Sequence, residues 1–165
     1  MEEAPIYNNE DERIKIVHEL GILDTPNEGR FDILTLEACE KLQMPISTIS
    51  IIDHNREWFK SRQGMNLQQG PRNVSFCGHA MYADYIFIVE DTLLDERFKD
   101  NPYVKGSPFV RFYAGVSLRD YKTKLPIGVL CVKDIKTRKM NQVEVGILLE
   151  LAAKAEEELN VGKNI

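Results

Sequence analysis

The chain has 165 residues, of which 43% are hydrophobic and 28% are charged. This composition is typical of a globular protein with a buried core, and the length fits a single domain. The formal net charge is −5, from 21 basic and 26 acidic residues that are interspersed along the chain. Because a nucleic-acid surface needs a basic stripe, we expect no nucleic-acid partner.

The chain carries no pattern of export or membrane insertion. Residues 1–5 are acidic and lack the charged-then-apolar order of a signal peptide, and no apolar run approaches the ~20 residues of a transmembrane helix. The cysteines Cys39, Cys77 and Cys131 are odd in number and widely spaced, which argues against a disulfide framework and fits a reducing compartment. The sequence therefore predicts a cytoplasmic protein.

Two helices are predicted near the N-terminus. Residues 9–12, Asn-Glu-Asp-Glu, have the pattern of a capping box, and apolar residues at helical spacing follow. Thr25 is predicted to cap a second helix, with Pro26 at its first position and Glu28 completing the box. This helix is expected to end before Pro45.

The middle of the chain predicts an antiparallel sheet. Strands are expected at residues 46–53, 58–62, 86–91, 109–118 and 127–134. Residues 64–73 are expected to form an irregular loop, and a short helical turn at 95–99 is expected to stop at Asn101-Pro102. Gly115 and Gly128 lie inside predicted strands, which indicates bulges or a close approach of another backbone.

A last helix is predicted to begin at Asn141, where Asn141 and Glu144 form another capping box. One apolar stripe along it steps by three and four residues: Val145, Leu148, Ala152, Ala155 and Leu159. A neighbouring stripe contains Val143, Ile147 and Leu151. Since one stripe is enough to pack on the chain's own sheet, the other could meet a second chain. The order of elements predicts an α+β fold with helices mainly on one side of the sheet.

Several short segments resemble those of a known domain family. They are residues 20–26, 30–32, 51–53, 58–61, 75–80 (Ser-Phe-Cys-Gly-His-Ala), 95–98, 101–102, 111–115 and 130–132. Together they resemble a GAF domain, the small-molecule sensor module of bacterial signalling proteins, over about residues 10–160, with tails at 1–9 and 161–165. The resemblance is to the subgroup found upstream of diguanylate cyclase, histidine kinase and phosphodiesterase domains.

The resemblance implies a fold and a place for a ligand. A central antiparallel sheet of five or six strands would carry the terminal helices on one face. Loops and short helices, from about Gln63 to Arg111, would cover a pocket on the other face. The implied function is a non-catalytic regulatory domain with an unidentified small-molecule ligand, no identified cofactor and no metal.

Candidate ligand-facing residues lie mostly in this span. They are Arg72, Phe76, Cys77, His79, Asp91, Arg111 and Tyr113. A small anionic or amphoteric ligand would suit the forked donor of an arginine and an aromatic wall. Arg111 could instead pair with Asp91 or Glu90 at the surface.

Cys77 and His79 allow more than one interpretation. Cys77 could be a reactive thiol at a helix start, or the two residues could ligate a metal, although no second ligand pair has a recognisable spacing. Reductases of free methionine sulfoxide with this fold carry a cysteine before a glycine on the corresponding segment, as Cys77-Gly78 does. Their resolving thiols and acidic substrate motif are not found here, nor are the signatures of bilin- and cyclic-nucleotide-binding relatives. Structural or pocket-wall roles are therefore favoured.

The resemblance also implies a homodimer through the terminal helices, which would relay a signal to a downstream output domain or protein. The stripe that contains Leu148 and Ala152 is the expected contact. A purely structural dimerisation module with a collapsed pocket is the remaining alternative, and the sequence leaves open whether the chain is a module of a longer protein.

Overall fold

The structure of the chain, a computed structural model, describes residues 1–162. One six-stranded sheet has the order β3-β2-β1-β6-β5-β4, and all neighbours pair antiparallel. The strands are β1 (Ile46–Ile52), β2 (Arg56–Gln63), β3 (Gln69–Pro71), β4 (Phe87–Val89), β5 (Phe112–Arg119) and β6 (Pro126–Asp134). The predicted α+β fold with a central antiparallel sheet is confirmed.

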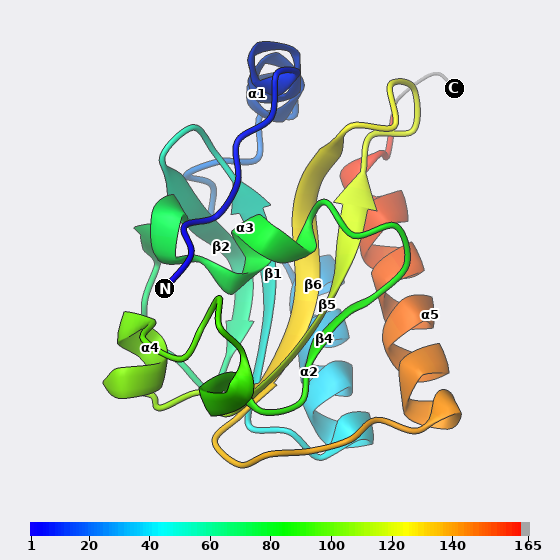
Figure 1. Ribbon diagram of the computed structural model, residues 1–165. Coiled ribbons are helices and arrows are strands. Elements are labelled where there is room, and N and C mark those ends of the chain that lie inside the picture. Colours follow the sequence, from blue (N-terminus) through cyan, green and yellow to red (C-terminus); the bar gives the residue numbers. More distant parts are fainter. Residues whose placement is uncertain (163–165) are drawn as a thin grey trace.

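Helices cover both faces of the sheet, and the long ones lie on one side. They are α1 (Glu10–Glu19), α2 (Gly29–Leu42), α3 (Phe76–Ala80), α4 (Pro102–Lys105) and α5 (Gln142–Leu159), with the 3₁₀ turns η1 (Arg72–Val74) and η2 (Thr92–Leu94). Figure 1 shows α2 and α5 side by side behind the sheet, with α3 and α4 in front of it. No helix within residues 1–162 is long and apolar enough to cross a membrane.

The strands contribute to two separate cores. In β6, Leu130 and Val132 pack with α2 and α5, whereas Val129 and Cys131 pack with α3 on the other face. β5 alternates in the same way, with Phe112 on the α2–α5 side and Tyr113 opposite. Because both faces of the sheet are buried at these strands, a charged side chain on either face needs a partner that compensates for its burial.

The α5 capping box is confirmed. Asn141 Oδ1 accepts a hydrogen bond from Glu144 N at 2.9 Å, and Glu144 Oε1 accepts one from Asn141 N at 3.2 Å. The box predicted at residues 9–12 is wrong, because Asn9 precedes α1 but its side chain makes no capping bond.

The predicted start of the second helix is also wrong. Helix α2 begins at Gly29, beyond the proposed cap at Thr25. Thr25 Oγ1 donates to Ile22 O and accepts from Lys60 Nζ at 2.8 Å, so this hydroxyl serves a loop. Residues 25–28 thus lead into the helix without capping it.

The segment between β2 and β5 contains more regular structure than predicted. The expected loop at 64–73 includes β3 and η1. Asn101-Pro102 begins α4 and does not merely end a turn, because Asn101 Oδ1 accepts from Tyr103 N at 2.9 Å and Pro102 occupies the first helical position. This cap places Tyr103 on the sheet face that carries α3.

The predicted tails are described in part. Ala4 N donates to Asn73 O and Glu2 N to Arg97 O, each at 3.0 Å, so the first residues run along the α3 side of the domain. An added Cβ on Gly78 would lie 2.7 Å from Ala4 Cβ, which explains a glycine there. Residues 163–165 of the expected C-terminal tail lie outside the described residues.

Candidate functional site

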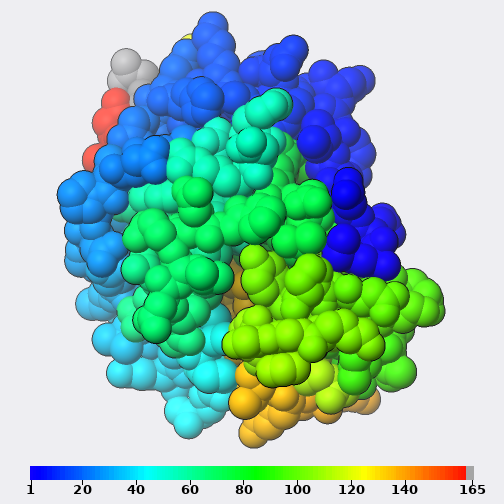
Figure 2. All heavy atoms as spheres, turned by 90° about the vertical axis from the view of Figure 1, so that its left-hand side faces the viewer, coloured from blue at the N-terminus to red at the C-terminus, as the bar shows by residue number. Residues whose placement is uncertain are grey.

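A cavity of about 460 Å³ opens on the sheet face that carries α3 and α4. It lies between β2 and the segment that follows it, the start of α3, the α4 region and β6. Figure 2 shows a hollow between the green and yellow-green segments, with orange atoms at its base. The volume is within the ~300–1,000 Å³ of small-molecule pockets.

The outer wall of the cavity is the segment after β2. Phe59 N donates to Gln68 O at 3.1 Å, which folds this segment back over the strand and places Met65 and Leu67 against the cavity. The fold-back requires Gly64, whose φ is +78° and whose added Cβ would lie 2.0 Å from Pro45 O. This covering explains how Phe59 can be buried although Trp58, its neighbour, packs on the opposite face.

Glu57 brings a buried carboxylate to the cavity. It lies on the cavity face of β2 together with Phe59, and the residue is only 4% exposed. Its Oε2 is buried and has no hydrogen-bond partner within residues 1–162. A buried carboxylate oxygen without a partner is costly, so this position needs a donor that the protein does not supply.

Lys133 brings the opposite charge from the neighbouring part of the sheet. It follows Val129 and Cys131 in the alternation of β6, and it lines the cavity. Burial would lower the pKa of Lys133, but interaction with Cys131 and Glu57 outweighs burial and raises the pKa above its usual range. The side chain is therefore an ammonium ion at neutral pH.

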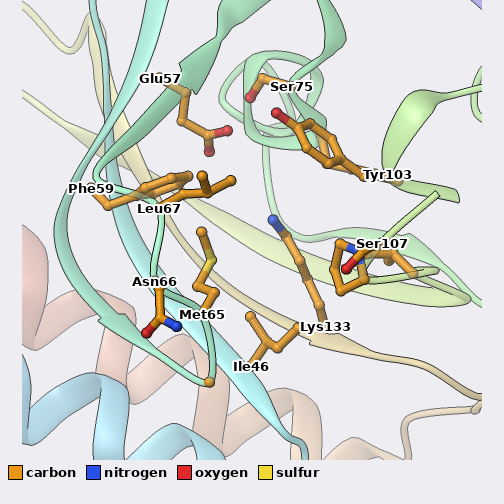
Figure 3. A pocket seen from close by; sticks show the side chains of 14 residues that line it. Ile46, Glu57, Phe59, Met65, Asn66, Leu67, Ser75, Tyr103, Ser107 and Lys133 are labelled. Carbon is orange, nitrogen blue, oxygen red and sulfur yellow. The ribbon is translucent and has the colours of Figure 1, made fainter.

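The polar groups of the cavity point toward a common space. Figure 3 shows the Lys133 ammonium below the Glu57 carboxylate, with the Tyr103 and Ser75 hydroxyls beside the carboxylate and Phe59, Met65 and Leu67 along one wall. Burial raises the pKa of Tyr103, so its hydroxyl stays protonated. The site thus combines one anion, one cation and two hydroxyls with an apolar wall, a combination suited to orienting a small polar ligand.

Of the seven ligand-facing residues predicted from sequence, Phe76 lines this cavity. Arg72 is instead a structural residue. Its Nη1 and Nη2 pair with Glu10 at 2.5 and 3.1 Å, and Nη1 also donates to the carbonyls of Asp53 and His54. The guanidinium is thereby directed to α1 and away from the cavity.

Cys77 and His79 belong to α3, and Cys77 packs with Tyr113 of β5 in the core on that face of the sheet. Cys77 is 0% exposed, and Tyr113 Oη donates to its Sγ at 3.0 Å. Burial, reinforced by Cys131, raises the pKa of the Cys77 thiol well above its usual value. His79 Nε2 lies 3.1 Å from Glu2 O, and burial lowers the pKa of this imidazole. None of these three residues lines the cavity.

Asp91 and Arg111 pair with each other, the arrangement weighed as the alternative from sequence. Arg111 Nη2 lies 3.0 Å from Asp91 Oδ1, and Asp91 Oδ1 also accepts from Leu93 N at the start of η2. The pair fixes η2 beside β5 and lies outside the cavity lining.

The stripe expected to pair two chains is used within this chain. Leu148, Ala152, Ala155 and Leu159 are all buried in the core between α5 and the sheet, and Val145 is partly buried. Any contact of α5 with a second copy would therefore involve other residues, such as Val143, which is 73% exposed.

Sequence reasoning missed Glu57, Lys133 and Tyr103. The available signal was an ionisable residue in the alternation of a core strand: Lys133 follows Cys131 by two positions, and Glu57 precedes Phe59 by two. Within residues 1–162, no three histidine, cysteine or acidic side chains converge to hold a metal ion.

Comparisons with known proteins give one close sequence relative. The chain is 41% identical over 138 residues to a cyclic di-GMP phosphodiesterase of Pseudomonas aeruginosa, a match that covers 84% of this chain and 23% of that protein. The chain therefore spans about a quarter of the relative's length. No protein-family model matches the chain.

Solved structures share the fold at low sequence identity. The GAF domain of an Acinetobacter phosphoenolpyruvate-protein phosphotransferase superposes with a TM-score of 0.64 at 14% identity, covering 93% of this chain and 94% of that chain. A type II free methionine-R-sulfoxide reductase from Thermoplasma acidophilum gives 0.57 at 15% identity, covering 80% and 98%. The sheet order, the terminal helices on one face and the covered cavity on the other agree with this likeness. The chain therefore has the fold of a GAF domain.

Proposed function

We propose that this domain is a non-catalytic sensory module that binds a small molecule in the cavity between β2, β6, α3 and α4. In this proposal, occupancy of the cavity regulates an output elsewhere in a longer protein. The observation that carries the proposal is the buried Glu57 carboxylate, which faces the cavity with an unpartnered oxygen and with Lys133 nearby. Charged groups held in a largely apolar cavity are stabilised when a ligand pairs with them.

The sheet offers a physical route from the cavity to the terminal helix. Lys133 lies at the cavity, while Leu130 and Val132 of the same strand pack against the α2–α5 layer. The end of α5 is tied to the sheet as well, because Glu156 Oε2 accepts from Arg119 N at 2.9 Å. A displacement of β6 on ligand binding would therefore reach α5 through packed side chains.

The name of the sequence relative supports a proposal for the output. In a protein organised like the Pseudomonas phosphodiesterase, the domain would control cyclic di-GMP hydrolysis carried out by another part of the chain. The 23% of that protein matched here leaves ample chain for a separate catalytic unit.

Two other functions receive less support. A thiol-dependent sulfoxide reductase needs an accessible thiolate. Cys77 is fully buried, its Sγ accepts a hydrogen bond from Tyr113, and burial raises the pKa of its thiol. We expect no thiol-dependent turnover of free methionine sulfoxide. A purely structural module would have its pocket filled by side chains, whereas this cavity is open.

A thermal-shift screen of a metabolite library tests the sensory function. A ligand at 100 times its Kd stabilises the folded state by about 2.7 kcal/mol, so binding should raise Tm measurably. Leu67→Trp would fill the cavity from its covering segment and should abolish the shift. Leu94→Trp, at an 83% exposed position outside the cavity lining, should leave it intact. A shift that persists in Leu67→Trp, or no shift with any compound, would contradict the proposal.

A further inference from the structure

Glu57 and Lys133 share one cavity without forming an ion pair with each other. Glu57 Oε2 has no partner within residues 1–162, and no ion pair or hydrogen bond joins Lys133 Nζ to another described side chain. Lys133 nevertheless interacts with Glu57, since Cys131 and, after it, Glu57 raise the pKa of Lys133 against the effect of burial. The two charges therefore interact electrostatically across a cavity that both residues line, without a direct contact.

The signs of these charges restrict the ligand class. A simple anion would pair with Lys133 but would be repelled by Glu57, and a simple cation would meet the reverse arrangement. A zwitterion pairs with both groups through charge-assisted hydrogen bonds and leaves neither charge unpaired in the cavity. The complex would then hold two anions and two cations in alternation.

The rest of the cavity favours an apolar substituent on the ligand. Phe59, Met65, Leu67 and Pro108 line it alongside the charged pair. Figure 3 shows Met65 and Leu67 on the side where Phe59 closes the wall, next to the space into which Lys133 points. An apolar side chain placed there would be removed from water, which is favourable in proportion to the area buried.

We propose, on the basis of the sensory function above, that the cavity binds a free amino acid with an apolar side chain. Its ammonium group donates to the Glu57 carboxylate, and its carboxylate accepts from Lys133 Nζ. The Tyr103 and Ser75 hydroxyls lie beside the Glu57 carboxylate and complete the polar end of the site.

The test uses the twenty L-amino acids, each at millimolar concentration, with Tm and calorimetric Kd as readouts. We expect one or more apolar amino acids to raise Tm. The N-acetyl derivative loses the ammonium and the α-carboxamide derivative loses the carboxylate. Each should therefore bind at least about tenfold more weakly, the loss that accompanies one charge-assisted hydrogen bond.

Two pairs of variants locate the binding. Glu57→Gln and Lys133→Met should each raise the Kd by about tenfold or more. Glu96→Gln and Lys154→Met make the same chemical changes at exposed positions outside the cavity and should bind like wild type. The blocked derivatives probe wild-type protein, so the test holds even where a cavity variant fails to fold.

The outcomes separate the ligand class from the sensory function. No shift with any of the twenty amino acids, or equal Kd values for blocked and free forms, would overturn the zwitterion proposal. If metabolites of another class shift wild type but not Leu67→Trp, the sensory function stands and the amino acid is excluded. If no compound of either set binds, both proposals fail.

Discussion

At the scale of single residues, two buried glutamates have opposite surroundings. Glu10 lies between two arginines: Arg13 Nη2 is 2.7 Å from Oε1, and Arg72 donates to both carboxylate oxygens. Arg13 Nη1 continues the network to Ile52 O at 2.8 Å, which ties α1 to the end of β1. Every charge in this group has a partner, in contrast to Glu57. Both oxygens of the Glu10 carboxylate are bonded within the protein, whereas Glu57 Oε2 has no partner among residues 1–162 and its residue lines the cavity.

Glu10 should make stability depend on pH in the acid range. Burial would raise its pKa, but hydrogen bonds from Arg13 and Arg72 outweigh burial and lower the pKa from 4.5 to about 2. The native state therefore binds this proton less readily than the unfolded chain. The resulting stabilisation is complete at pH values above 4.5, the pKa of the unfolded chain, and it is lost as the pH falls toward 2. We expect Glu10→Gln to lower the free energy of unfolding by about 3 kcal/mol at neutral pH, and by less in acid.

Urea denaturation at neutral pH and in progressively more acidic buffer measures both effects. Glu12→Gln, an exposed change on the same helix, is the control and should leave the free energy of unfolding nearly unchanged. Parallel pH profiles for wild type and Glu10→Gln would show that the ion-pair network does not carry the expected acid sensitivity.

The role of Arg72 shows a limit of the sequence at this scale. An arginine before the Ser75–Ala80 segment suits an anionic ligand as well as it suits a buried carboxylate. The choice depends on Glu10, which lies in a different helix and reaches Arg72 only through the fold. Residue type alone therefore predicted an ionic partner but not which one.

At the scale of elements, long periodic segments were predictable and local starts were less so. The strand expected at residues 109–118 and the capping box of α5 are both found, because each depends on neighbours within one element. The α2 start was misplaced because the Thr25 hydroxyl bonds to the nearby Ile22 carbonyl and to the distant Lys60 ammonium instead of capping the helix. The three-residue elements β3, η1 and η2 are too short to produce a periodic signal.

Gly128 shows the close backbone approach that a glycine inside a strand indicates. An added Cβ would lie 2.2 Å from Ser50 O, on the backbone of the paired strand β1. Because that backbone is held by the sheet, we expect Gly128→Ala to lower the free energy of unfolding by about 3 kcal/mol. Chemical denaturation followed by circular dichroism gives the value.

Gly146 is the matched control for this substitution. It lies within α5, and nothing is within 4 Å of its added Cβ. Gly146→Ala should therefore raise the free energy of unfolding by roughly 0.5–1 kcal/mol, because alanine is the better helix former. Equal effects of the two substitutions would contradict the steric explanation for Gly128.

At the scale of the whole molecule, the position of the cavity was foreseen and its chemistry was not. Most of its covering residues fall in the span between β2 and β5 that the family resemblance indicated. Glu57 and Lys133 come from strands on either side of β1, at distant points of the sequence. Their meeting is a property of sheet order, which strand periodicity does not specify.

The outward side of the helix layer carries apolar side chains that the fold leaves exposed. Ile33 and Leu36, one turn apart on α2, are 55% and 45% exposed, and Val143 at the start of α5 is 73% exposed. α2 and α5 run antiparallel, because Arg30 near the start of α2 pairs with Glu158 at the end of α5 at 3.1 Å. Val143 therefore lies toward the end of α2, on the same layer as Ile33 and Leu36.

We predict that two copies of the domain associate through this outward side of α2 and α5. Light scattering at tens of micromolar should give the mass of a dimer for wild type and of a monomer for the double variant Ile33→Glu, Leu36→Glu. The variant should remain folded by circular dichroism, because both positions are exposed in the single chain. Leu94→Glu, at an exposed position in η2 and outside α2 and α5, should remain dimeric. Leu148→Glu should unfold the domain, since Leu148 lies in the core. A monomeric wild type, or dimerisation that survives the double variant, would contradict the prediction.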